Sequence, residues 1–164
     1  MPFSPALTGT AAALLDAYRR SSLRIVTAES CTGGLIAACL TEIAGSSDVV
    51  ERGFVTYSNQ SKLELLGVPT ETLEKHGAVS PHVARAMVEG ALAHSPADVA
   101  VAVTGIAGPG GATPAKPVGL VYLACQRRGR EPLIERHQFH GDRQAVRVAA
   151  LEAAFELLRQ ELDD

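Results

Sequence analysis

The sequence predicts an α/β domain of three layers, in which helices cover both faces of a mixed, mostly parallel sheet. Helical and strand patterns alternate along the chain, and no repeat or linker divides it. The run 98–104 is almost purely apolar, as expected of a strand that helices cover on both faces. A short polar turn joins the last two predicted strands, 118–125 and 133–139, so this pair is expected to be antiparallel.

The first third of the chain contains a helix, a strand and a second helix. An apolar stripe at helical spacing predicts the first helix over 6–18. The β-branched run 23–28 predicts a strand. A Gly-Gly pair at 33–34 then opens an apolar helix over 35–43, which Gly45 ends.

The middle of the chain contains one strand between polar segments and two helices. The residues 53–57 predict the strand, and 59–66 a short helix that the following Gly-Val-Pro terminates. A serine followed by a proline is the signature of a helix start, which predicts the next helix over 81–93.

The last part of the chain supplies the remaining strands and the final helix. The strand 98–104 leads into a glycine-proline loop over 105–117, before the antiparallel pair described above. The final helix begins after Gly141-Asp142, and its apolar stripe continues as far as Leu162. That stripe could pack on the sheet or on a neighbouring subunit, so the sequence is compatible with a homo-oligomer.

Composition and charge exclude several classes of protein. The chain is 46% hydrophobic, too apolar for a disordered protein, yet it has no run of about 18 uncharged apolar residues to span a membrane. With 15 basic and 18 acidic residues, it lacks the positive charge of a nucleic-acid-binding protein. The N-terminus lacks the basic region of a secretory signal, and the three scattered cysteines are typical of reduced thiols. We therefore expect a cytoplasmic protein, and the five histidines lack the spacing of a metal site.

Three segments leave predicted strands at their carboxyl ends, where open α/β sheets bind ligands. They are unusually rich in reactive residues or glycine, and they cover 29–34, 57–62 and 104–111. The carboxyl ends of parallel strands meet at one edge of a sheet, so these segments predict a shared site.

The first segment places Ser30 at a strand-to-helix corner. The backbone amides that follow, of Cys31, Thr32, Gly33 and Gly34, have no helical acceptor and face whatever lies above the helix. Together with the helix dipole they could bind a phosphate, or the oxyanion that forms when Ser30 attacks a carbonyl. The alternative is that Ser30 is an ordinary N-cap.

The second segment could supply the proton acceptor that a serine nucleophile needs. No histidine lies at an obvious strand end, but Lys62 can act as a base if burial lowers its pKa. Tyr57 and Lys62 flank a strand-to-helix turn, so both can face one crevice. The alternative is a tyrosine at the edge of the core and a solvated lysine.

The third segment is a glycine loop that follows Thr104. Its glycines allow a backbone to approach a ligand closely, and they are Gly105, Gly108, Gly110 and Gly111. The order and spacing match neither a Walker loop nor a dinucleotide fingerprint, so a flexible connection is the alternative. Arg143, at the start of the last helix, opposes the helix dipole, which suggests an anion ligand unless the side chain is simply solvated.

These strings in combination strongly resemble the CinA C-terminal-domain family. The resemblance runs from about residue 7 to about 160 in the family's order and spacing. The strings that carry it are TAESCTGG at 27–34, GFVTYSN at 53–59 with Lys62, VTGIAGP at 103–109, KPVG at 116–119 and GDR at 141–143. Ala112 departs from the glycine run of many relatives.

The resemblance implies an amidohydrolase that converts nicotinamide mononucleotide into nicotinate mononucleotide and ammonia, in pyridine nucleotide salvage and without a cofactor. Ser30 matches the family's nucleophile, Tyr57 and Lys62 its partners in proton transfer, and the glycine loop and Arg143 its nucleotide site. Many relatives carry a molybdopterin-binding-like domain before this one. The chain has no room for it, so we expect the stand-alone form, a single domain over 1–164.

Three alternatives remain open at this point. Cys31 is a rival nucleophile at the same helix start, where thiolates are favoured, although only one of two neighbouring residues at a strand end should face the crevice. The chain could also be a nucleotide-binding or regulatory module without turnover, or a structural partner-binding domain. Whether Tyr57 or Lys62 accepts the proton is undecided.

Overall fold

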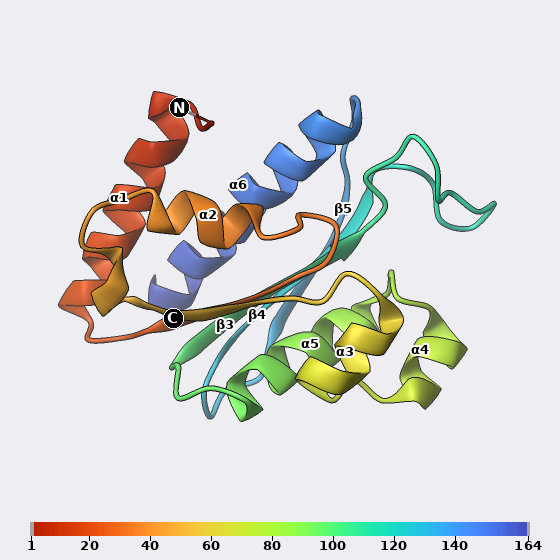
Figure 1. Cartoon of the computed structure of the whole chain (residues 1–164), viewed down its shortest axis with the longest axis horizontal. Coiled ribbons are helices and arrows are strands. Elements are labelled where there is room, and N and C mark those ends of the chain that lie inside the picture. The colour runs from red at the N-terminus through yellow and green to blue at the C-terminus, as the bar shows by residue number, and fades with distance from the viewer. Residues whose placement is uncertain (1, 164) are drawn as a thin grey trace.

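The computed structural model describes residues 2–163, in which the predicted helices and strands follow one another in the expected order, with one additional helix (Figure 1). The domain predicted over 1–164 includes Met1 and Asp164, which lie outside the described residues. The elements are α1 (Pro5–Arg20), β1 (Ile25–Glu29), α2 (Leu35–Thr41), the 3-10 turn η1 (Ser46–Asp48), β2 (Val50–Val55), α3 (Asn59–Leu66), α4 (Thr70–His76), α5 (Pro81–Ala93), β3 (Val99–Gly105), β4 (Leu120–Arg127), β5 (Leu133–Gln138) and α6 (Arg143–Asp163).

The five strands form one sheet in the order β2-β1-β3-β4-β5. The strand β1 lies between β2 and β3 and is parallel to both, whereas β4 is antiparallel to β3 and to β5. Four of the five strands therefore run in one direction, which confirms a mixed, mostly parallel sheet. The carboxyl ends of β1, β2 and β3 meet at one edge of it.

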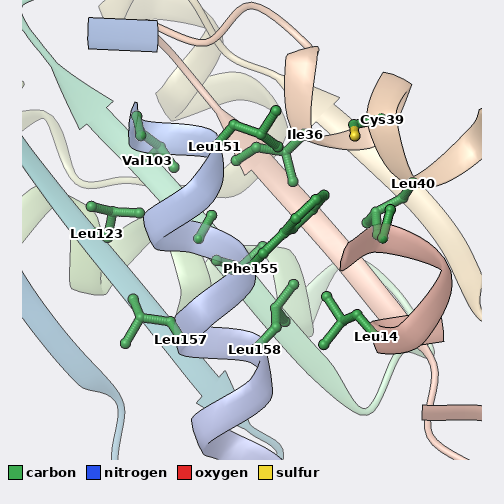
Figure 2. Packing of buried hydrophobic residues seen from close by; sticks show 14 of the residues in the cluster. Leu14, Ile36, Cys39, Leu40, Val103, Leu123, Leu151, Phe155, Leu157 and Leu158 are labelled. Carbon is green, nitrogen blue, oxygen red and sulfur yellow. The ribbon is translucent and has the colours of Figure 1, made fainter. Parts of the chain in front are cut away.

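Helices cover both faces of this sheet, as a three-layer fold requires. Figure 1 shows α1, α2 and α6 on one face and α3, α4 and α5 on the other. Strand β3 separates the two cores by alternation: Val101 and Val103 belong to the first, and Ala100 and Ala102 to the second. In the first core, Phe155 of α6 extends toward α1 and α2 (Figure 2). The small side chains of Ala100 and Ala102 on the second face of β3 let α5 lie close to the sheet.

The structure corrects the predicted elements in several places. Strands β1 and β4 start two residues later than predicted, at Ile25 and Leu120, and β4 ends two residues later, at Arg127. The strand β2 starts three residues before the predicted segment 53–57 and ends two residues earlier, because it lies at the sheet edge, where Glu51 and Arg52 form an ion pair at the surface. Helix α4 was not predicted, since it is short and mostly polar, and Leu73 is its buried residue. Helix α2 ends at Thr41 rather than at 43.

Two helical glycines predict opposite effects of the same substitution on stability. A Cβ at Gly90 of α5 would clash with the Leu66 carbonyl oxygen of α3, so one helix must shift, whereas a Cβ at Gly9 of α1 meets nothing within 4 Å. We expect Gly90→Ala to lower the free energy of unfolding by about 1–3 kcal/mol or more. Gly9→Ala should raise it by about 0.5–1 kcal/mol, because alanine favours helix. Urea unfolding of both variants checks this, and equal effects would contradict the close crossing of α3 and α5.

Candidate active site

A cavity of about 280 Å³ opens at the carboxyl ends of β1, β2 and β3. All three predicted segments contribute to its wall, which includes Ser30, Cys31, Tyr57, Lys62, Thr104, Gly105, Gly108, Gly110, Gly111 and Arg143. The predicted residues Thr32, Gly33 and Gly34 lie behind this wall rather than in it. Sequence reasoning missed Ala78 and Val79, from the connection between α4 and α5, because that connection carries no reactive side chain.

The side chains of Ser30 and Lys62 meet in the wall of the cavity. The Lys62 Nζ atom donates to the Ser30 Oγ atom at 2.9 Å and to the Thr56 carbonyl at 2.7 Å. Lys62 is 1% exposed and Ser30 is 8% exposed. A reciprocal capping box between Ser58 and Ser61 starts α3 and thereby fixes Lys62 in its first turn, facing inward. The predicted alternative of a solvated lysine is therefore wrong.

Burial lowers the pKa of Lys62 from its ordinary value of 10.5 to about 8. The physical cause is desolvation, which disfavours the charged ammonium group. The oxygens that accept from Nζ are a hydroxyl and the carbonyls of Thr56 and, at 3.4 Å, Tyr57, so each is neutral. A lysine in these surroundings can exist as a neutral amine near physiological pH.

Ser30 is not a helix cap, which settles that alternative. Helix α2 begins at Leu35, and its N-cap is Gly34, which offers no side-chain cap. The buried carboxylate of Glu29 accepts from the amides of Ile36 and Ala37 instead, at 2.9 and 3.1 Å. The Ser30 hydroxyl therefore does not cap the helix and instead accepts a hydrogen bond from Lys62. The segment TAESCTGG contained Glu29, and the start of α2 at Leu35 was predicted, but the sequence did not reveal that the turn before α2 brings the Glu29 carboxylate to the amides of Ile36 and Ala37.

The backbone after Ser30 forms a turn of its own before α2. The Gly33 amide donates to the Ser30 carbonyl at 2.9 Å, and the Ser30 amide donates to Val103 of β3 at 3.0 Å. Gly33 and Gly34 have φ angles of 58° and 100°, a region that favours glycine. Because the Gly33 amide is engaged within the turn and Thr32 does not line the cavity, the Cys31 amide is the better candidate to face a ligand.

Tyr57 and Arg143 meet at the mouth of the cavity. Tyr57 is 61% exposed, and its hydroxyl accepts from the Arg143 Nη2 atom at 3.0 Å. The Arg143 Nη1 atom donates to the Gly108 carbonyl at 2.8 Å. Arg143 therefore joins the end of β2 to the glycine loop. The Tyr57 group that lies near Lys62 is its carbonyl, so the geometry favours Lys62 over the Tyr57 hydroxyl as the proton acceptor for Ser30.

Cys31 lies beside Ser30, and both residues border the cavity. The Cys31 side chain is also part of the core with α1, α2 and α6. Burial raises the pKa of its thiol to about 11, so it stays protonated at neutral pH. The turn thus disfavours the thiolate that a cysteine nucleophile needs.

The glycine loop after β3 forms another part of the cavity wall. Gly108 and Gly111 have φ angles of 86° and 90°, and a Cβ at Gly105 would lie 2.9 Å from the Leu120 carbonyl oxygen. The Thr104 hydroxyl donates to the Ala78 carbonyl at 2.8 Å and so joins β3 to the segment after α4. The loop is therefore anchored at its start rather than freely flexible.

Two further properties hold within residues 2–163. No group of three or more His, Cys, Asp or Glu residues is placed to bind a metal ion there, and none of the helices in that range is long and apolar enough to cross a membrane. The cysteines Cys31, Cys39 and Cys125 are buried and not paired in disulfides.

Comparison with known proteins identifies close relatives of this chain. It is 54% identical over 148 residues to the "Putative competence-damage inducible protein" of Symbiobacterium thermophilum, a match that covers 85% of this chain and 35% of that protein. It is 54% identical over 126 residues to "Nicotinamide-nucleotide amidohydrolase PncC" of Enterobacter agglomerans, covering 77% of each. The chain spans about a third of the length of the curated relatives named CinA-like protein or putative competence-damage inducible protein.

The fold has equally clear relatives among solved structures. The crystal structure of the competence/damage inducible protein CihA from Agrobacterium tumefaciens is 48% identical, with a TM-score of 0.95, and the match covers 99% of this chain and 98% of that one. The family model of the CinA C-terminal domain matches residues 7–162, which confirms the resemblance of the sequence motifs. The chain therefore belongs to the CinA C-terminal domain family.

Proposed function

We propose that this chain is an amidohydrolase that converts nicotinamide mononucleotide and water into nicotinate mononucleotide and ammonia, with Ser30 as nucleophile and Lys62 as base. The observation that carries the proposal is the 2.9 Å contact between the Lys62 Nζ atom and the Ser30 Oγ atom at the wall of the cavity. The name of the relative from Enterobacter agglomerans supports the choice of substrate. The free cysteines suit a reducing cytoplasm, where pyridine nucleotide salvage takes place.

The first half of the reaction acylates the serine. The Ser30 Oγ atom attacks the carboxamide carbon, and its proton moves to the neutral Lys62 amine. The negative oxygen of the tetrahedral intermediate is stabilised by the amide of Cys31, which borders the cavity. When the carbon–nitrogen bond breaks, the Lys62 ammonium group returns the proton to the leaving nitrogen, so ammonia departs and a nicotinoyl ester of Ser30 remains.

The second half hydrolyses that ester. The Lys62 amine is neutral again and takes a proton from water, whose oxygen attacks the ester carbonyl. The carbon–oxygen bond to Ser30 then breaks, and the Lys62 proton returns to the Oγ atom. Arg143 and the glycine amides lie at the cavity mouth, where they can bind the phosphate and ribose of the nucleotide.

A binding module without turnover is the alternative that the geometry supports less well. Such a module could use the glycine loop and Arg143, but it has no need for a lysine that is 1% exposed and contacts neutral oxygens. Burial of an ammonium group without a counter-ion is unfavourable, so such a group is more often functional than structural.

Ammonia release from the purified chain tests the proposal. We expect nicotinamide mononucleotide to yield equimolar ammonia and nicotinate mononucleotide. Nicotinamide riboside, which lacks the phosphate, should react far more slowly, because Arg143 and the glycine loop then have no anion to bind. Calorimetry on the same samples measures binding. Tight binding of the mononucleotide without ammonia would contradict the proposal and identify a binding module.

A further inference from the structure

Arg147 of α6 contacts the turn that carries Ser30. Its Nε atom donates to the Cys31 carbonyl at 3.2 Å, and its Nη2 atom donates to the Thr32 carbonyl at 3.0 Å. Arg147 lies one helical turn after Arg143, but unlike Arg143 it does not line the cavity in the described part of the chain. Its guanidinium group therefore acts on the backbone of the turn and not on the ligand space.

These two contacts fix the peptide groups that follow the nucleophile. A peptide group is planar and trans, so the carbonyl of one residue and the amide of the next point in opposite directions. When Arg147 binds the Cys31 carbonyl, it sets the direction of the Thr32 amide. When it binds the Thr32 carbonyl, it sets the direction of the Gly33 amide. That amide in turn donates to the Ser30 carbonyl at 2.9 Å.

The buried side chain of Glu29 also binds this turn. Its Oε1 atom accepts a hydrogen bond from the Thr32 hydroxyl at 2.7 Å, and its carboxylate also accepts hydrogen bonds from two backbone amides of α2. Thr32 is thus bound through its side chain by Glu29 and through its carbonyl by Arg147. The turn needs such restraint because two glycines, Gly33 and Gly34, give it more conformational freedom than a helical turn would have.

We propose that Arg147 is a positioning residue, which holds the Ser30 turn in the geometry for attack without touching the substrate. The inference rests on the proposed function, because it assigns to Arg147 a part in that reaction. It predicts that loss of Arg147 affects the chemical step more than substrate binding. Misplacement of a reacting group by about 1 Å can cost about 100-fold in rate.

The test uses Arg147→Met and Arg147→Lys, with Arg159→Met as the matched control. Arg159 is an exposed arginine on the same helix that pairs with Glu156 and Asp163, far from the turn. Lysine keeps the charge at 147, but its compact ammonium group lacks the planar fork that spans the two carbonyls. Arg147→Lys also retains most of the side chain, so it keeps the test valid if Arg147→Met folds poorly in urea unfolding.

The first readout is the rate at which a fluorophosphonate probe labels Ser30, followed by mass spectrometry. In this reaction the Ser30 Oγ atom forms a bond to phosphorus, the phosphorus–fluorine bond breaks, fluoride leaves, and the serine proton moves to Lys62. We expect labelling to slow by about 10- to 100-fold in both Arg147 variants and to be unchanged in Arg159→Met. The pH midpoint of labelling should stay at the wild-type value, because Lys62 is intact.

The second readout is kcat and KM for nicotinamide mononucleotide, where kcat should fall and KM change by no more than about threefold. Full labelling rates in Arg147→Met, or full recovery in Arg147→Lys, would overturn the inference, the latter because charge alone would suffice. A raised KM with unchanged kcat would overturn it too, since Arg147 would then bind substrate. If wild type is labelled but releases no ammonia, the proposed function fails, while the labelling rates still decide the role of Arg147.

Discussion

Ser30→Ala is expected to abolish ammonia release from nicotinamide mononucleotide, with a loss in kcat of about 10⁴-fold or more. The variant removes the attacking oxygen, and alanine cannot form the ester intermediate. Substrate affinity should change little, because the mouth of the cavity, with Arg143 and the glycine loop, stays intact. Ammonia assays and calorimetry on the same preparation measure the two effects separately.

A matched serine provides the control for this substitution. Ser95 precedes β3 at the opposite edge of the sheet, and Ser95→Ala should keep the wild-type rate. Substantial turnover by Ser30→Ala would refute the serine mechanism. If Cys31→Ser then lost activity while Ser30→Ala kept it, the neighbouring thiol would be the nucleophile, against the raised pKa that burial gives it.

Lys62→Met should lower kcat by about 10²- to 10⁴-fold, the range typical of a lost general base. In the proposed mechanism the active form of the wild type is the neutral amine, so the rate should rise with pH through the Lys62 pKa of about 8. At pH 7 only about a tenth of the molecules carry the neutral amine. The residual activity of Lys62→Met should lack this rise, and pH–rate profiles from pH 6 to 10 measure it.

The same lysine predicts how stability depends on pH. The folded pKa of about 8 lies below the ordinary 10.5, so between these values the unfolded chain binds a proton that the folded chain does not. The free energy of unfolding should therefore rise as pH increases from about 8 toward 10.5. Lys62→Met should remove this contribution and be the more stable protein near neutral pH, where the wild type buries an ammonium group.

The exposed Lys75 of α4 supplies the control for both measurements. Lys75→Met should retain the pH–rate profile and the pH-dependent stability of the wild type, because its side chain is solvated. If urea unfolding at pH 7 and 9 gave Lys62→Met the same pH dependence as the wild type, the burial of Lys62 could not be the cause. A pH–rate profile that persisted in Lys62→Met would assign the proton transfer to another group.

The elements that could be predicted from the sequence are those with local end signals. Helices α3 and α5 match the predicted bounds 59–66 and 81–93, because Ser58 and Ser80 cap them and glycine or polar residues follow. The strand β2 could not be placed correctly, since an edge strand needs no alternating apolar pattern and its pairing with β1 is a long-range property.

The site could be predicted as a set of residues but not as a set of contacts. The strand ends predicted that Ser30 and Lys62 lie in one region, and the start of α2 at Leu35 was predicted too. That Glu29 rather than Ser30 accepts from the first amides of α2 depends on how the intervening turn folds, which no local pattern reveals. The contact between Arg147 and the Cys31 carbonyl joins residues 116 positions apart, and no local pattern reveals such a pair. The residue types of the site could therefore be predicted, but the backbone conformation of the turn after Ser30 and contacts between residues far apart in the sequence could not.

Helix α6 connects two parts of the site mechanically. Arg143 reaches the mouth of the cavity and Arg147 reaches the nucleophile turn, and they are separated by about 6 Å along one rigid helix axis. The angle at which α6 lies on the sheet is set far away, where Phe155 and Leu158 pack in the core. Any tilt of this helix would displace Arg143 and Arg147 together, so under the proposed mechanism the packing of α6 would change substrate affinity and reaction rate at the same time.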